Sequence, residues 1–191
     1  MIGIVEKRVS ETGRGGGCVL PHIPTFRYSS VFWGLIVVGM MVGRPAFAAC
    51  TDPAAPGVQW LRCYVDGRSL ASADLARANV RESTFQRSDL SRANFSEANA
   101  YRSKMISARM MEAKLDGAAF IEADFTRADL TRASLNNTDL RRARFYHTIL
   151  REANLTGARL EGADLLNADL TGAMWTDGVR VCGANSIGQC N

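Results

Sequence analysis

A five-residue periodicity, unbroken over more than half of the chain, limits this sequence to very few folds. Every fifth residue from Leu70 to Trp175 is apolar, and most of these positions hold Leu or Phe. From Ala73 to Ala173, the residue two positions before each of them is Ala, Ser or Thr. A period of five matches neither the 3.6 of a helix nor the 2 of a strand. It predicts a solenoid in which each pentad turns one corner.

The pentad itself has a consensus: Ala, then Asp or Asn, then Leu or Phe, then two variable residues. Clear copies begin at Ala73, Ala93, Ala123, Ala128, Ala153, Ala163 and Ala168. Over about residues 68–177 the chain therefore resembles the pentapeptide repeat family. The resemblance implies an all-β fold, a right-handed four-sided parallel β-helix of about five coils with four pentads per coil. Leu or Phe would point inward, and the small residue would pack beside it.

The outward charges test the four-sided coil independently. If a coil takes twenty residues, side chains twenty apart stack at about 4.8 Å, and like charges should not face each other. Four such series alternate in sign: Glu82, Arg102, Glu122, Arg142; Arg92, Glu112, Arg132, Glu152; Asp89, Arg109, Asp129; and Lys104, Asp124, Arg144, Asp164. A fifteen-residue coil would instead stack Glu82, Glu97 and Glu112. The charges favour twenty residues per coil.

These patterns divide the chain into four segments. Residues 1–48 are expected to be a signal peptide with an upstream segment, and residues 68–177 the β-helix. Both ends of a β-helix expose unpaired backbone and need covering. Residues 49–67 are therefore expected to form an N-terminal cap, and residues 178–191 a C-terminal cap.

The apolar run over residues 31–42 is shorter than the ~20 residues that span a bilayer. Pro45 and a small-x-small sequence ending at Ala48 follow it, which is the pattern of a secretory signal peptide cut after Ala48. We expect a periplasmic or secreted protein. The alternative is an uncut anchor that leaves the repeats outside the cytoplasm.

Four cysteines flank the repeats, and none lies within them: Cys50, Cys63, Cys182 and Cys190. An even count in an exported protein suggests disulfides, and the wide separation of the two ends favours Cys50–Cys63 and Cys182–Cys190. The alternative is lipidation of Cys50, which would attach the protein to a membrane. Zinc binding is disfavoured because no tight C-x-x-C pair is present.

Charge and residue types exclude several functions. Of 23 basic and 19 acidic residues, five basic and two acidic ones lie in residues 1–48, which leaves 18 and 17. This near-neutral body argues against nucleic-acid binding. The segment after Ala48 has a single histidine, His147, and no phosphate-binding glycine loop. We therefore expect no enzyme activity, no cofactor and no metal.

One outward-facing group stands out from the polar surface. It comprises Tyr101, Ile106, Ile121, Tyr146 and Leu166, and we refer to these five residues as the apolar strip. An apolar, tyrosine-bearing patch on a rigid rod is a candidate binding surface for a protein partner or for a second copy. The alternative is ordinary exposure of scattered apolar residues.

The sequence thus favours an exported, non-enzymatic scaffold or protein-binding module. The resemblance implies an alternative, a cytoplasmic gyrase-protecting protein that mimics DNA. That role needs a strongly acidic face, and the many arginines of the repeat argue against it. An enzyme acting on cell-wall glycans would need acid and base groups in a cleft, which a convex rod does not obviously provide. Fold alone does not decide among these.

Overall fold

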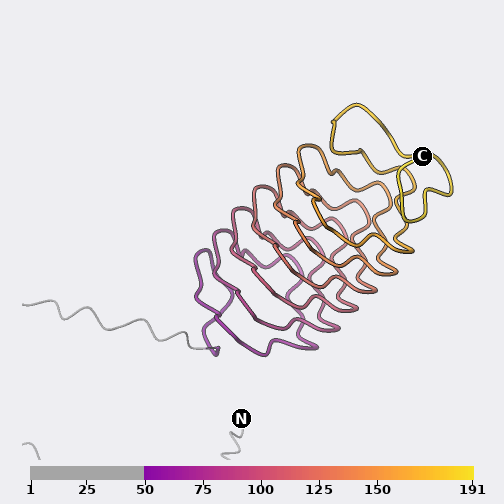
Figure 1. Cartoon of the computed structure of the whole chain (residues 1–191). Helices are drawn as coiled ribbons and strands as arrows, with labels where there is room; N and C mark the ends of the chain where they lie inside the picture. Colours follow the sequence, from indigo (N-terminus) through magenta and orange to yellow (C-terminus); the bar gives the residue numbers. More distant parts are fainter. Residues whose placement is uncertain (1–49) are drawn as a thin grey trace, which may run out of the picture. The chain divides into compact units, whose positions relative to one another are not determined.

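The computed structural model describes residues 50–191, and the signal segment expected over residues 1–48 lies outside them. The described chain winds into successive coils stacked along one axis, with loops of the C-terminal residues at one end (Figure 1). Parallel β-bridges join residues twenty apart, from Gln59–Asn79 to Asn154–Met174. Each coil therefore takes four pentads, in the register that the alternating charges predict.

The bridges define four sides, which we name by their bridge residues. Side A carries residues 59, 79, 99, 119, 139 and 159; side B carries 64, 84, 104, 124, 144 and 164; side C carries 69, 89, 109, 129, 149 and 169; and side D carries 74, 94, 114, 134, 154 and 174. The chain runs from A to D in each coil. The AB corner is formed by residues 61–62 and their equivalents every twenty residues, and the BC corner by 66–67 and their equivalents.

Over residues 50–191 the structure has single-residue bridges and turns, without a helix or an extended strand. The turn explains this. The small residue donates its N–H to the carbonyl of the apolar residue three positions earlier, as Ala73 does to Leu70 at 3.0 Å. The second corner residue has a positive φ, for example 58° at Arg127, as a turn with a left-handed third residue requires. Two of every five residues therefore bend the chain.

The first bridge residue is Gln59, so the regular coil begins inside the segment that the sequence assigned to the N-terminal cap. Trp60, Cys63 and Val65 occupy interior positions of this first coil and are buried. Residues 59–67 therefore combine two roles. They continue the coil and, through Cys63, hold the preceding segment.

The interior is filled by the apolar residue of each pentad. One column on side D contains Leu75, Phe95, Leu115, Leu135 and Leu155, all at most 1% exposed. The residue immediately before each of them forms a β-bridge with its equivalent in the next coil, which places the five side chains in one stack. Aromatic rings also contact one another along the interior: Trp60, Phe85, Phe95, Phe120, Phe125 and Phe145 form a series with centroid separations of 5.1–6.4 Å. A continuous apolar core thus runs through the coil.

At most of the small interior positions that hold Ser or Thr, the hydroxyl finds a fixed partner; the buried hydroxyl of Ser103 has none within residues 50–191. Ser88, Thr138 and Thr148 each donate to the carbonyl of the apolar residue 23 positions earlier, at 2.7–2.8 Å. A buried hydroxyl without such a partner would cost stability. This bond links neighbouring coils where Ala would only fill space.

Asp and Asn recur at the bridge position for a related reason. Their side-chain oxygen accepts the N–H of the residue two positions later, as in Asp124 with Thr126 at 2.9 Å and Asp164 with Leu166 at 3.0 Å. This Asx arrangement satisfies a corner N–H. The recurrent acidic residues therefore stabilise turns and form no common site.

Candidate functional site

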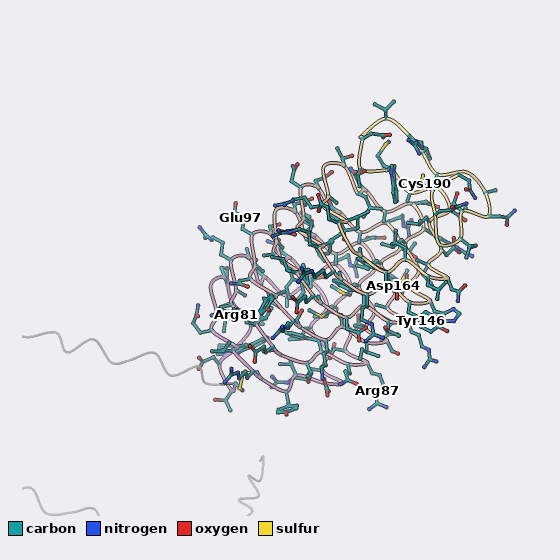
Figure 2. The ribbon with its side chains drawn as sticks, in the orientation of Figure 1. Arg81, Arg87, Glu97, Tyr146, Asp164 and Cys190 are labelled. Atoms are coloured by element: carbon teal, nitrogen blue, oxygen red, sulfur yellow. A yellow bond between two sulfur atoms is a disulfide. The ribbon has the colours of Figure 1, made fainter. Side chains whose placement is uncertain are left out.

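The apolar strip lies in two rows on the corners that flank side B. Tyr101 and Ile121 belong to the AB corner, and Ile106, Tyr146 and Leu166 belong to the BC corner. Leu166 is 58% exposed, whereas the other four side chains are half-buried. Figure 2 shows Tyr146 on the outside of the coil, with Asp164 close to it in this view.

Side B separates the two rows with charged side chains. Lys104, Asp124, Arg144 and Asp164 follow one another along it, and Arg144 pairs with Asp124 at 3.7 Å. The five strip residues therefore do not form one continuous apolar patch. They frame a charged column, so a partner that contacts both rows must also contact these charges.

Tyr101 already has partners within the chain. The guanidinium groups of Arg81 and Arg102 lie 5.4 Å and 5.0 Å from its ring centroid, a distance at which cations are attracted to aromatic rings. Tyr146 has a freer ring, which contacts only His147 edge-on among the aromatic side chains of residues 50–191, at 4.3 Å. Tyr146 and Leu166 are therefore the strip residues best placed to bind a partner.

Within residues 50–191, six large apolar residues outside the strip are also exposed, and two of them, Leu61 and Tyr64, lie close to it along the coil. Leu61 is 40% exposed and Tyr64 is 84% exposed. Leu61 lies on the AB corner, forty residues before Tyr101, and Tyr64 is the first bridge residue of side B. The twenty-residue register identifies both once the coil is extended backwards through Cys63 and Val65, which continue the small and apolar positions of the repeat.

The charged ladder on the AB corner is the most regular electrostatic feature. Arg62 donates to Glu82 at 2.8 Å, and Arg102 donates to Glu122 at 2.7 Å. Arg142 lies 3.6 Å from the other oxygen of Glu122. The hydrogen bond from Arg102, with the nearby charges of Arg102 and Arg142, holds the pKa of Glu122 below its ordinary value. Such exposed pairs each contribute little stability but keep the coils in register.

The four flanking cysteines lie in pairs at the two ends of the coil. Cys50 is joined to Cys63, and Cys182 to Cys190, by disulfide bonds. Cys63 and Cys182 are buried, whereas Cys50 is exposed. Figure 2 places Cys190 beside the loops at the C-terminal end. Each bond therefore anchors one end segment to a terminal coil.

The remaining polar features lie at the corners of the coil. His147 is exposed at the BC corner. Two surface hollows lie at corners, one lined by Ser91, Arg92, Met111 and Glu112 and the other by Ile121, Arg141, Arg142 and Glu161. Within the described part of the chain, no three His, Cys, Asp or Glu side chains are grouped to hold a metal ion. No helix in residues 50–191 is long and apolar enough to cross a membrane.

The repeat decides the family. The model for pentapeptide repeats matches in eight copies over residues 73–110, 108–145 and 138–174, which together cover more than half of the chain. The chain belongs to the pentapeptide repeat family. No curated protein sequence matches it.

Solved pentapeptide repeat structures are similar in fold. HetL from the cyanobacterium Nostoc, which is involved in heterocyst differentiation regulation, is 32% identical with a TM-score of 0.58, and the match covers 66% of this chain and 62% of HetL. The chain thus spans less than two thirds of HetL. A trypsin-treated variant of QnrB1, a plasmid-mediated fluoroquinolone resistance protein, is 22% identical with a TM-score of 0.45, covering 58% of each chain. A protein from the thylakoid lumen of Arabidopsis thaliana is 26% identical with a TM-score of 0.37, covering 62% of this chain and 72% of that one.

Proposed function

We propose that this pentapeptide repeat protein is an exported, non-enzymatic scaffold that binds a protein partner, or a second copy, through the apolar strip. The coil is expected to be right-handed, as the family resemblance implies. The observation that carries the proposal is the placement of Tyr146 and Leu166 next to each other on one corner, with Leu166 58% exposed. Tyrosine is a typical anchor of protein interfaces, and the exposed Leu166 adds apolar contact area beside the half-buried Tyr146.

The double change Tyr146→Glu and Leu166→Glu should weaken partner binding strongly. An aromatic anchor commonly contributes about 2 kcal/mol, so the loss of Tyr146 alone corresponds to a roughly thirty-fold loss of affinity, and the loss of Leu166 adds to it. Both side chains lie outside the core, so folding should be retained. The partner is first identified by crosslinking in the native compartment with mass spectrometry, and its affinity for purified wild type and variant is then measured.

A matched control is available on the neighbouring corner, which side C separates from Tyr146 and Leu166. Met111 and Thr131 are also twenty residues apart and occupy the same position of the pentad on the corner between sides C and D. Changing both to Glu should leave the affinity unchanged. If the strip variant binds as tightly as wild type, the strip is ordinary surface. If the strip variant unfolds, the assignment of inside and outside is wrong.

Export is the second part of the proposal, supported by the apolar run over residues 31–42, the small-x-small site and the cysteine pairs at the two ends. Mature protein from its producing cell should begin near Ala49. Non-reducing peptide mapping should find Cys50 linked to Cys63 and Cys182 linked to Cys190. A protein with an intact Met1 and free thiols in the cytoplasm would contradict export and would favour the gyrase-protecting alternative.

A further inference from the structure

The C-terminal end of the coil is covered on only two of its four sides. After residue 178 the chain turns back along sides C and D, and its carbonyls accept hydrogen bonds from the last coil (Figure 1). Leu170 donates to Ser186 at 2.9 Å, and Gly172 donates to Cys182 at 2.8 Å. The cap thus continues the backbone pairing of the coil on these two sides.

Sides A and B of the last coil lack this cover. The N–H groups of Leu160, Gly162 and Leu165 have no acceptor within residues 50–191, and the carbonyls of Ala158 and Ala163 have no donor there. One coil earlier the same positions are all paired: Leu140, Arg142 and Phe145 donate to the next coil at 2.7–3.0 Å. Residues 158–165 therefore present an open edge, with three donors and two acceptors spaced as in a β-bridge ladder.

The apolar interior is also accessible at this edge. Leu160, Ala163 and Leu165 are half-buried, whereas the equivalent Leu140 and Phe145 one coil earlier are fully buried. Unpaired backbone beside partly exposed core residues is what a sheet edge offers to an added strand.

The cap limits the length of the open edge. Gly157 donates to Thr176 at 2.9 Å before the edge, and Gly188 donates to Ala168 at 2.8 Å after it. A side chain at position 188 would lie 3.7 Å from the nitrogen of Asn167, so the cap also borders the far end. An added segment can therefore pair over about two pentads, from Ala158 to Leu165.

The charges specify what such a segment should carry. The outermost charges at the bridge positions are Arg159 on side A and Asp164 on side B, and Glu161 lies between them on the AB corner, 3.9 Å from Arg159. Along side A, Arg159 already faces Asp139 at 3.6 Å. Continuing the alternation requires an acidic residue opposite Arg159 and, five residues later, a basic residue opposite Asp164.

We propose that the edge at residues 158–165 binds an extended segment of another polypeptide, which adds as the next turn of the coil. The eight residues of this segment should be, in order, a small residue, an acidic residue, a large apolar residue, two variable residues, a small residue, a basic residue and a large apolar residue. The chain contains this pattern at residues 138–145, with the sequence TDLRRARF. In the structure, residues 138–145 belong to the preceding coil and pair with residues 158–165 on the side away from the open edge. A peptide with the sequence of residues 138–145 is therefore a suitable probe of the edge. This edge is distinct from the apolar strip and does not depend on the proposed function.

The test uses a labelled peptide copying residues 136–147, NNTDLRRARFYH, and the full chain with both disulfides formed. The control peptide, NNTRLRRADFYH, has the same composition with the acidic and basic bridge residues exchanged. The first peptide should bind at least about tenfold more tightly, measured by fluorescence anisotropy, because the control places like charges against Arg159 and Asp164. The two bridge residues of the first peptide are its Asp and the Arg that precedes Phe. Methylation of the backbone nitrogens of these two residues should also weaken binding, since it removes the N–H donors to the carbonyls of Ala158 and Ala163.

A reciprocal variant keeps the test independent of peptide behaviour. In a protein carrying Arg159→Glu and Asp164→Arg, the preference between the two peptides should invert, provided that thermal unfolding shows an intact coil. Equal binding of both peptides to wild type, or binding by neither, would overturn the proposal. Sedimentation would also show whether the wild-type protein forms a dimer. If it does, and if the first peptide dissociates this dimer, the edge binds a second copy of the chain and the proposal is overturned.

Discussion

Replacing Leu135 by Asp is expected to unfold the centre of the coil. Leu135 is fully buried, and its neighbours in the column on either side, Leu115 and Leu155, are buried apolar side chains that offer a carboxylate no partner. Burying a carboxyl group there adds a polar desolvation cost to the loss of the leucine side chain, together at least about 4 kcal/mol. Since domains are stable by about 5–15 kcal/mol, denaturant unfolding should show a large loss or no folded protein.

Leu135→Met is the matched control, because it keeps the volume and the apolar character. It should cost less than about 1.5 kcal/mol. If Leu135→Asp destabilises no more than the Met variant, position 135 faces solvent, and the assignment of the interior column is incorrect.

Removing the N-terminal disulfide should produce the second largest effect. Cys50 and Cys63 are separated by 13 residues, and a crosslink that closes a loop of this size contributes about 3 kcal/mol by restricting the unfolded chain. The double change Cys50→Ala and Cys63→Ala should lower the unfolding free energy by this amount. Ala is suited to position 63, because Ala occupies most of the equivalent small interior positions.

The single change Cys50→Ala tests whether the bond, rather than the side chain at position 63, provides the stability. It should destabilise the oxidised protein as much as the double change does. Added reductant should lower the stability of wild type at least to that of the double variant, since reduction also opens the C-terminal bond. Equal unfolding midpoints for oxidised wild type and the double variant would show that the N-terminal bond does not stabilise the coil.

The repeating part of the fold follows from the sequence because one local rule is used again in every pentad. The apolar period places Leu or Phe inside, and the alternation of Glu82, Arg102 and Glu122 sets the twenty-residue register; the bridges have that register. The Asx turn at Asp124 explains a preference that the sequence shows only as a recurrence. The positions of the repeat residues were predictable because each residue contacts the residues twenty positions before and after it, which occupy the same place in their own coils.

The ends could not be predicted in the same way, because their contacts occur only once. The sequence placed a cap over residues 178–191 but gave no sign that it would cover sides C and D alone. The open edge at Leu160 and Leu165 depends on where the chain leaves the coil. Likewise, the strip was expected on neighbouring sides, and only the structure shows a charged column with Asp124 and Arg144 between its rows.

Site-specific photocrosslinking from position 146 tests the proposed binding surface most directly. A photoreactive phenylalanine derivative replaces Tyr146 in one protein and Met111 in another, and both are irradiated in the native compartment. We predict one defined protein adduct from position 146, lost when Leu166→Glu is added, and no such adduct from position 111. The same adduct from both positions, or none from position 146, would contradict partner binding through the apolar strip.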